Sequence, residues 1–247
     1  MPPAVEPLAG TAERGTYTGR VIDIVVTGLS ANSVPYLSGL EQQRTLHAAV
    51  VEGRAPNTVM LLEHESVYTA GKRTAPHEHP TDGTPVVQVD RGGKITWHGP
   101  GQLVGYPILR LPDPVDVVAY VRRLEGMLMA VLADLGVHGA ERVPGRSGVW
   151  VRGSDKVAAI GIRVAQGVTM HGFALNCSNS FDPYRTIVAC GLADAGVTSV
   201  SRELGRTVTP EDVVPLIRHH FGTLVVEPGI PDAPTTDPAR RTQEVSA

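Results

Sequence analysis

Two cysteines are the residues of this chain that could act as nucleophiles. Cys177 closes a predicted strand and is by default a small buried apolar residue, whereas Cys190 lies in a predicted loop. A thiol with a pKa of about 8.5 is only slightly ionised at neutral pH, so a reactive cysteine needs a cation nearby. Spacing does not show which cation meets a thiol, and it leaves open that both cysteines are structural. The available cations are Lys156, Arg91, His98 and His171.

Lys156 opens a predicted strand that is otherwise small and apolar, with the sequence VAAIG over 157–161. A lysine at the end of a strand is usually solvated. Here the alanines and the glycine leave room for a ligand beside the amine, which favours a functional role. At a separation of about 4 Å, an ammonium and a thiolate attract by about 4 kcal/mol at an effective dielectric near 20, which is enough to ionise the thiol.

The segment from Arg91 to Gln102, RGGKITWHGPGQ, is a candidate binding wall. Glycine and proline clusters flank a short β-like run at 94–97, which predicts a turn, a strand and a second turn. Glycine lets the backbone approach a ligand closely, and Arg91, Thr96 and His98 would be held between the two turns. Taken alone, the segment fits equally well a glycine-rich hairpin with a structural histidine.

Composition excludes several classes of function. The chain has 247 residues, of which 42% are hydrophobic and 19% are charged, as in ordinary soluble globular proteins. A net charge of −3 provides no basic field for nucleic acid or an anionic membrane, although a local basic patch for an acidic partner remains allowed. Two cysteines without Cys-x-x-Cys spacing predict neither a disulfide framework nor a zinc site. We expect no metal and no cofactor.

The ends of the chain carry no targeting signal that we recognise. No apolar run reaches the roughly 18 residues of a transmembrane helix, and the N-terminus MPPAVEP has neither a basic nor an apolar signal region. We therefore expect a cytoplasmic protein with both thiols free. Composition predicts a disordered arm over 1–18 and a disordered tail over 228–247, on either side of one domain at 19–227.

Hydrophobic patterns predict strands and helices in alternation, with a β-rich second half. Pro107 inside one strand predicts an edge strand or a bend. Expected helices run from Pro35 to Gly53 with Asn32 or Ser33 as cap, from an Asp113 cap to Gly136, and onward from a Thr209 cap. Expected strands cover residues 21–26, 58–62, 86–89, 94–97, 103–109, 148–152, 156–164, 168–177 and 224–226.

Three stretches in register carry a resemblance to a known family. The first is RGGKITWHGPGQLV, which begins at Arg91. The second consists of GVW from Gly148, KVAAIG from Lys156 and HGFALN from His171. The third is CGL from Cys190 together with VTS from Val197. In this order and spacing they resemble the lipoyl(octanoyl) transferase family, the octanoyl-carrier-protein:protein transferases of lipoate biosynthesis, over about residues 20–225.

The resemblance implies an α/β (α+β) fold, a mixed β-sheet with packed helices like the catalytic domain of biotin and lipoate protein ligases. It implies Cys190 as the acyl-accepting cysteine and Lys156 as its partner, with His171 as a candidate supporting residue. Trp97, Cys177 and Ala189 depart from the family pattern, and none removes a group that the reaction needs. The implied substrate-binding residues are Arg91, Gly92, Gly93, Lys94, Ile95, Thr96, Trp97, His98, Ala159, Ile160, Gly161, Gly172, Phe173 and Ala174.

The implied partners are acyl carrier protein, which carries the octanoyl group on phosphopantetheine, and the lipoyl domains of 2-oxoacid dehydrogenases and the glycine cleavage H protein. Transfer through a cysteine thioester splits one acyl transfer into two steps. Lys156 as ammonium would stabilise the Cys190 thiolate, and as free amine it would take a proton from the incoming lysine. The alternatives are an ATP-dependent lipoate or biotin ligase on the same fold, a non-catalytic acyl-protein binding module, and a cysteine hydrolase that uses His98 or His171.

Overall fold

A mixed nine-stranded sheet forms the centre of the protein. The computed structural model describes residues 11–17, 20–80, 84–187 and 196–225. Most neighbouring strands are antiparallel, whereas β2 and β3 are parallel, and so are β10 and β12. Along the sheet the strands follow the order β1 (Thr11–Tyr17), β2 (Arg20–Gly28), β3 (Asn57–Leu62), β7 (Gln102–Ile108), β11 (Val168–Asn176), β10 (Asp155–Ala165), β9 (Arg146–Val151) and β8 (Ala140–Val143), and β12 (Gly196–Val197) pairs with β10.

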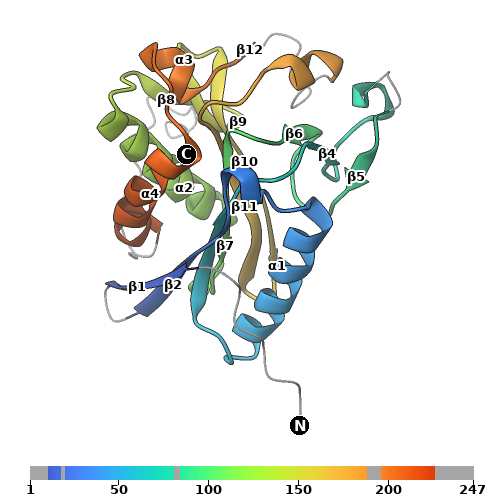
Figure 1. The fold of residues 1–247 in the computed structure, drawn as a ribbon. Helices are drawn as coiled ribbons and strands as arrows, with labels where there is room; N and C mark the ends of the chain where they lie inside the picture. Colours follow the sequence, from blue (N-terminus) through green and yellow to red (C-terminus); the bar gives the residue numbers. More distant parts are fainter. Residues whose placement is uncertain (1–10, 18–19, 81–83, 188–195, 226–247) are drawn as a thin grey trace, which may run out of the picture.

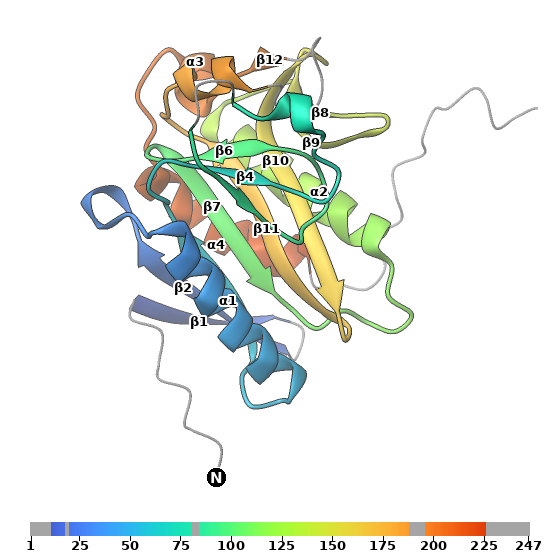
Figure 2. The same ribbon diagram turned by 90° about the vertical axis from the view of Figure 1, so that its right-hand side faces the viewer.

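Different elements cover the two faces of this sheet (Figures 1 and 2). One face packs on helices α2 (Val117–Leu135) and α4 (Pro210–Val225). The other face packs on α1 (Tyr36–Val51) and on a small sheet of β5 (Val86–Gln88), β4 (Val67–Ala70) and β6 (Thr96–His98). The short helix α3 (Val200–Leu204) precedes α4, and 3₁₀ turns form at Ser30–Asn32, Pro76–Glu78 and Asp182–Thr186.

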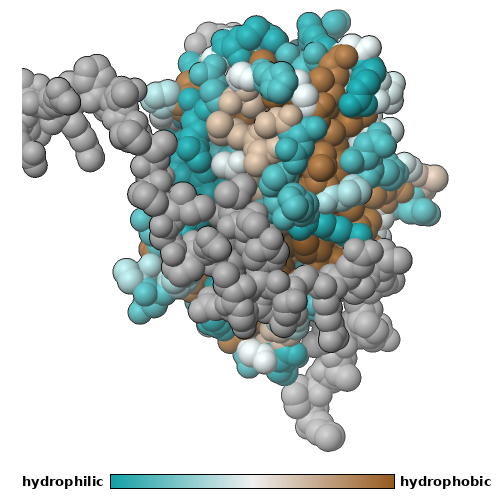
Figure 3. Space-filling model, turned by 90° about the vertical axis from the view of Figure 1, so that its left-hand side faces the viewer, coloured by the Kyte–Doolittle hydropathy of each residue, from teal (hydrophilic) through white to brown (hydrophobic). Residues whose placement is uncertain are grey.

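The two-residue period of a strand explains how one strand serves both layers. In β3, Val59 and Leu61 belong to the core against α2 and α4, whereas Met60 and Leu62 belong to the core against α1. The outer surface on the α2 and α4 side mixes hydrophilic residues with a hydrophobic strip (Figure 3). Every helix in the described ranges is too short or too polar to cross a membrane.

The mixed α/β architecture is the predicted one, and most predicted elements are present. The helix that begins after Pro35, the strand at 58–62 and the hairpin of β10 and β11 agree with the sequence within a few residues. Gly136 ends α2 with a φ of 95°, in the left-handed region that glycine tolerates, as expected.

Several expectations at the ends of elements were wrong. Residues 11–17, assigned to a disordered arm, form β1 and pair with β2. No side chain caps α1, because Asn32 belongs to a 3₁₀ turn and Pro35 occupies the cap position. The cap of α2 is Asp116, which accepts a hydrogen bond from the Ala119 N–H at 2.9 Å, and not Asp113. Residues 224 and 225 continue α4 and form no strand.

Of the two alternatives for Pro107, the edge strand was wrong, because β7 lies in the middle of the sheet between β3 and β11. Its pairing with β11 covers Gln102 to Gly105 and is interrupted at Pro107, which has no N–H to donate. The Pro107 carbonyl accepts instead from the Thr169 hydroxyl at 2.6 Å. His171 of β11 lies beyond the paired segment, and its φ is +57°.

Candidate active site

A cavity of about 190 Å³ lies on the α1 side of the central sheet, between that sheet and the small sheet. The small sheet provides one wall, β7, β10 and β11 provide another, and Tyr36 of α1 closes one end. The lining residues are Tyr36, Arg73, Arg91, Gly93, Lys94, Thr96, His98, Val104, Tyr106, Gly145, Arg146, Ser147, Lys156, Ala159, Ile160, Gly161, His171, Gly172, Phe173 and Ala174.

Most of the predicted site residues therefore share one cavity, but three do not line it. Ile95 and Trp97 are buried with Tyr68 in a small core of their own, where the Trp97 indole N–H donates to the Ser66 hydroxyl at 2.9 Å. Gly92 donates its N–H to the Ile162 carbonyl at 3.0 Å and fixes the turn to β10. The lining residues that the sequence did not indicate are Tyr36, Arg73, Val104, Tyr106, Gly145, Arg146 and Ser147.

Lys156 points into the cavity because of a β-bulge. On β9, Trp150 pairs with Lys156 and Val149 pairs with Ala158, so Val157 is an extra residue. The bulge leaves both Val157 and Ala158 in the core against α2 and α4, and it places Lys156 on the cavity side with Ala159. The Lys156 side chain is buried, and its ammonium lies 4.5 Å from the centre of the Trp150 ring, a favourable cation–π distance.

The Arg91 side chain organises the glycine-rich turn. Its guanidinium donates to the carbonyls of Gly92 at 3.0 Å and Lys94 at 2.9 Å, and to the carbonyl and hydroxyl of Thr69, both at 2.9 Å. These bonds fasten the turn to β4. A Cβ on Gly71 would lie 2.5 Å from the Gly93 carbonyl and 2.7 Å from the guanidinium, so the turn packs there without space for a side chain.

Lys94 at the mouth of the cavity forms an ion pair with the buried Glu78. Burial raises the pKa of Glu78, but the hydrogen bonds from Lys94 and from the Ala75 N–H outweigh it and hold that pKa below its usual value. The pair ties the 3₁₀ turn at 76–78 to the glycine-rich turn.

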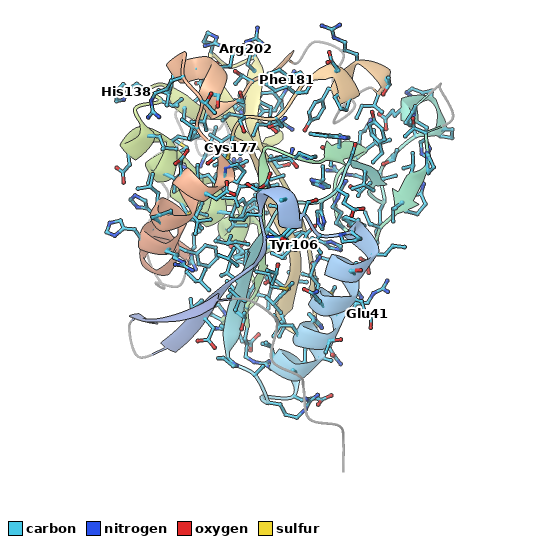
Figure 4. The ribbon with its side chains drawn as sticks, viewed as in Figure 1. Glu41, Tyr106, His138, Cys177, Phe181 and Arg202 are labelled. Atoms are coloured by element: carbon cyan, nitrogen blue, oxygen red, sulfur yellow. The ribbon has the colours of Figure 1, made fainter. Side chains whose placement is uncertain are left out.

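Three buried histidines gather on the cavity side of the sheet. His64 uses both ring nitrogens, with Nδ1 donating to the Val34 carbonyl at 2.8 Å and Nε2 accepting from the Tyr106 hydroxyl at 2.6 Å. Tyr106 lies between the sheet and α1 (Figure 4). Burial lowers the pKa of His64 to about 4 and that of His98 to about 3. Both rings are therefore neutral at neutral pH.

His171 belongs to a different chain of contacts. Its Nε2 lies 2.9 Å from Asp90, whose other oxygen accepts from Arg163 at 2.6 Å, and its backbone N–H donates to the Gln43 side chain at 3.0 Å. Burial lowers the pKa of His171, against the opposing effect of Asp90. His171 thus lines the cavity, and its partners fix its ring.

Small residues form the apolar wall of the cavity. Ala159 and Gly161 come from β10, and Gly172 and Ala174 come from the paired β11. A Cβ on Gly172 would lie 2.1 Å from the Gly105 carbonyl, so the two central strands approach each other too closely there for any side chain. The wall can accommodate an apolar chain, with few groups that could hydrogen-bond to it.

Comparison with known proteins assigns the family. The profile of the lipoyl protein ligase A/B catalytic domain matches residues 35–222, which is more than half of the chain. The chain belongs to this family. Curated relatives in it include octanoyltransferases of Clavibacter michiganensis subsp. michiganensis, 70% identical over 81% of this chain and 89% of the relative, and of Leifsonia xyli subsp. xyli, 63% identical over 77% and 87%. The protein is an enzyme of the acyltransferase class.

Solved structures share the fold of this lipoyl protein ligase A/B catalytic domain. A bipartite lipoate protein ligase from Thermoplasma acidophilum has a TM-score of 0.60 at 15% identity, covering 79% of this chain and 81% of that chain. The biotin protein ligase from Aquifex aeolicus has a TM-score of 0.53 at 11% identity, covering 81% and 69%. At these identities the likeness establishes the fold alone, and it is the predicted ligase-like fold.

The two cysteines of this family member differ in what the structure says of them. Cys177 follows β11, is fully buried, and donates weakly to the Leu175 carbonyl at 3.5 Å. Its place just beyond the end of β11 is labelled in Figure 4. Burial raises the pKa of its thiol to about 12, so Cys177 is the structural residue that the sequence predicted. Cys190 and its neighbour Ala189 lie outside the described residues. In the described ranges, no three acidic, histidine or cysteine side chains are grouped to hold a metal.

Proposed function

We propose that the protein transfers an octanoyl group from acyl carrier protein, through a thioester on Cys190, to the lysine of lipoyl domains in lipoate biosynthesis. One observation carries this proposal: a buried lysine, Lys156, lies beside an apolar wall of alanine and glycine. The wall suits an acyl chain, and the amine suits the chemistry at the end of that chain. The names of the curated relatives support the octanoyl group.

The described residues on both sides of Cys190 are anchored, and those that follow it lie beside Lys156. Gly196 and Val197 of β12 pair with Asp155 and Lys156, and five residues lie between Cys190 and Gly196 along the chain. On the other side Ile187 packs in the small core with Trp97. This connectivity supports Lys156 as the cation that stabilises the Cys190 thiolate, the role that the sequence resemblance implies.

In the first half-reaction, the Cys190 thiolate attacks the carbonyl carbon of the octanoyl thioester. The bond from that carbon to the pantetheine sulfur breaks, and the leaving thiolate takes a proton from the Lys156 ammonium. In the second half-reaction, the amine of the acceptor lysine attacks the acyl carbon, and the bond to Cys190 breaks. Lys156, now a free amine, takes a proton from the charged nitrogen of the tetrahedral adduct, so that breaking the bond to Cys190 leaves a neutral amide and restores the ion pair with the Cys190 thiolate.

The remaining cavity residues position the substrates in this proposal. Ala159, Gly161 and Ala174 contact the acyl chain, and Arg91 and Lys94 shape the turn at the mouth of the cavity. At about 0.8 kcal/mol per buried CH₂, the fit of the chain sets its preferred length. An acceptor-lysine amine enters at the same mouth, after the carrier protein has left.

Adduct mapping tests the proposal. Incubation with octanoyl carrier protein, without ATP or divalent metal, should add one octanoyl group, and peptide mapping should place it on Cys190. Cys177→Ala is the matched control, since it removes the only other thiol of the chain, and it should be acylated normally. An adduct on Cys177, or full activity in Cys190→Ser, would refute the assignment. A requirement for ATP would favour the ligase alternative.

A further inference from the structure

His98 lines the cavity, and within the described residues one of its ring nitrogens has a hydrogen-bond partner and the other has none. Its Nδ1 lies 2.7 Å from the Gln102 side-chain oxygen. Across the described part of the chain, its Nε2 has no hydrogen-bond partner, and His98 lines the cavity. His64, by contrast, uses both nitrogens. The chemical role of His98 therefore depends on which nitrogen carries the proton.

Two backbone carbonyls settle that question. The Asn176 amide nitrogen donates to the Thr198 carbonyl at 3.0 Å, so the Asn176 oxygen faces Gln102. The Gln102 nitrogen then donates to that oxygen at 2.9 Å, and it also lies 3.4 Å from the Trp97 carbonyl. A carbonyl cannot donate, so neither amide can be reversed without facing oxygen to oxygen. The Gln102 oxygen is left to face His98, and Nδ1 must carry the proton.

The three residues of this hydrogen-bonded relay, His98, Gln102 and Asn176, are all buried, and their environment keeps the His98 ring neutral. His98, Gln102 and Asn176 are each less than 10% exposed. The His98 ring stacks on Tyr36 with an interplanar angle of 5° and centroids 6.3 Å apart. Burial lowers the pKa of His98 to about 3, helped by the nearby His64 and opposed by the bond to Gln102. His98 thus offers a lone pair at Nε2 and does not hold a second proton.

We propose that Gln102 and Asn176 are positioning residues that lock His98 in the Nδ1–H tautomer, so that Nε2 accepts a hydrogen bond from an N–H group of the substrate. This inference rests on the proposed function. Two substrate groups have the required chemistry, the amine of the acceptor lysine and the amides of the pantetheine arm. No proton is transferred to His98 in either case; the contact orients the donor group next to Lys156, which lines the same cavity.

The tautomer itself can be measured without any activity. In ¹⁵N-histidine-labelled enzyme, the resonance pair that disappears in His98→Asn belongs to His98, one of nine histidines. Around neutral pH its Nδ1 should show the shift of a protonated nitrogen and its Nε2 that of an unprotonated one. Ser66→Ala, which deletes the bond from the Trp97 indole outside the relay, should leave both shifts unchanged. An Nε2–H tautomer, or an imidazolium, would overturn the inference.

Two variants test the use of that lone pair. His98→Asn keeps an amide donor for Gln102 and removes the acceptor at Nε2, and we expect it to slow one half-reaction roughly ten- to one-hundred-fold. Gln102→Glu places a carboxylate beside the ring, which raises the pKa of His98. Relative to the wild-type enzyme, its rate should therefore fall as pH decreases through that pKa and recover at higher pH.

Single-turnover rates separate the two N–H sources. If His98→Asn slows transfer from pre-formed acyl-enzyme to a lipoyl domain, the donor is the acceptor lysine; if it slows acylation by octanoyl carrier protein, the donor is a pantetheine amide. Wild-type rates in both half-reactions for both variants would overturn the inference. Failure of the wild-type enzyme to form an acyl-enzyme would instead contradict the proposed function, and the nitrogen shifts would then decide the tautomer alone.

Discussion

The two faces of the nine-stranded sheet bury different kinds of side chain. Against α2 and α4 the sheet packs mainly aliphatic and aromatic residues, in a continuous core that includes Leu124, Leu128 and Ile217. Against α1 and the small sheet, the core gives way to three buried histidines, amide side chains and the cavity. Both faces belong to the same strands and both bury a hydrophobic cluster, and the α1 side in addition buries the polar side chains that line the cavity.

Removing Lys156 should have the largest effect on activity. In the proposed mechanism Lys156→Ala removes both the cation that stabilises the thiolate and the proton acceptor, so we expect kcat/KM to fall roughly 10²- to 10⁴-fold. Without the ammonium, the pKa of Cys190 should rise toward or above its ordinary value of about 8.5. Iodoacetamide labelling at neutral pH should therefore slow and recover as pH increases. Labelling with the wild-type pH dependence would mean that Lys156 does not ionise the thiol.

A truncation on the opposite face should affect stability and leave chemistry intact. Leu128 on α2 is fully buried, so Leu128→Ala should lower the free energy of unfolding by about 2–5 kcal/mol. The rate per folded molecule should not change. Val118→Ala is the control on the same helix, because Val118 is 69% exposed and its truncation should cost within about 0.5 kcal/mol. A lower rate per folded Leu128→Ala molecule would contradict the division between the faces.

Enlarging the apolar wall should change the choice of acyl chain. Ala159→Leu adds bulk inside the cavity, so relative kcat/KM should shift from octanoyl toward shorter chains by about fourfold for each methylene that no longer fits. Competition between acyl carrier proteins with chains of different length measures this shift. Ala48→Leu makes the same change at an exposed position of α1 and should leave the preference unaltered. An unchanged preference in Ala159→Leu would show that the chain binds elsewhere.

The buried histidines on the α1 side of the sheet should make the stability of the protein sensitive to acid, which is the smallest of these effects. The folded-state pKa values of His64 and His98 lie below the usual 6.5, at about 4 and 3. The unfolded chain therefore binds more protons below about pH 6.5, and stability should decrease as pH falls from there toward those values. Urea midpoints at about pH 7.5 and pH 5 measure the loss, and His98→Asn should reduce it by about 1–2 kcal/mol. Equal losses in both proteins would contradict a buried neutral His98.

Local patterns predicted the layers better than the connections between them. The stripe of α2, the strand at 58–62 and the glycine after α2 depend on neighbours in sequence, and they were found. The position of Pro107 in a central strand depends on β11, more than 60 residues away, whose Thr169 hydroxyl satisfies the proline carbonyl. Propensity cannot indicate such a partner. The cap of α2 was placed at Asp113 because two aspartates compete near Pro114, and only Asp116 meets a free N–H.

In the site, too, features that depend on sequence neighbours were predicted, and features that depend on distant residues were not. Motifs indicated Lys156 and most of the pocket, but the spacing did not reveal the bulge at Val157 that turns Lys156 into the cavity. Tyr36 and Tyr106 were missed because each comes from an apolar stripe, where an aromatic residue is usually core. Gln102 lay in a quoted motif without a role, since its role depends on Asn176, 74 residues later. The prediction for Cys190 falls on residues outside the described ranges.

The most direct test of the account is single-turnover acylation and transfer by Lys156→Arg. A guanidinium keeps the positive charge and does not deprotonate at these pH values, so the variant retains the cation that stabilises the thiolate. It can neither give a proton to the leaving pantetheine thiolate, which water can protonate instead, nor take one from the acceptor amine. Intact mass spectrometry should show an octanoyl group accumulating on Cys190, with transfer to the lipoyl domain slowed far more than acylation. Transfer at the wild-type rate, or no acyl-enzyme at all while product still forms, would contradict it.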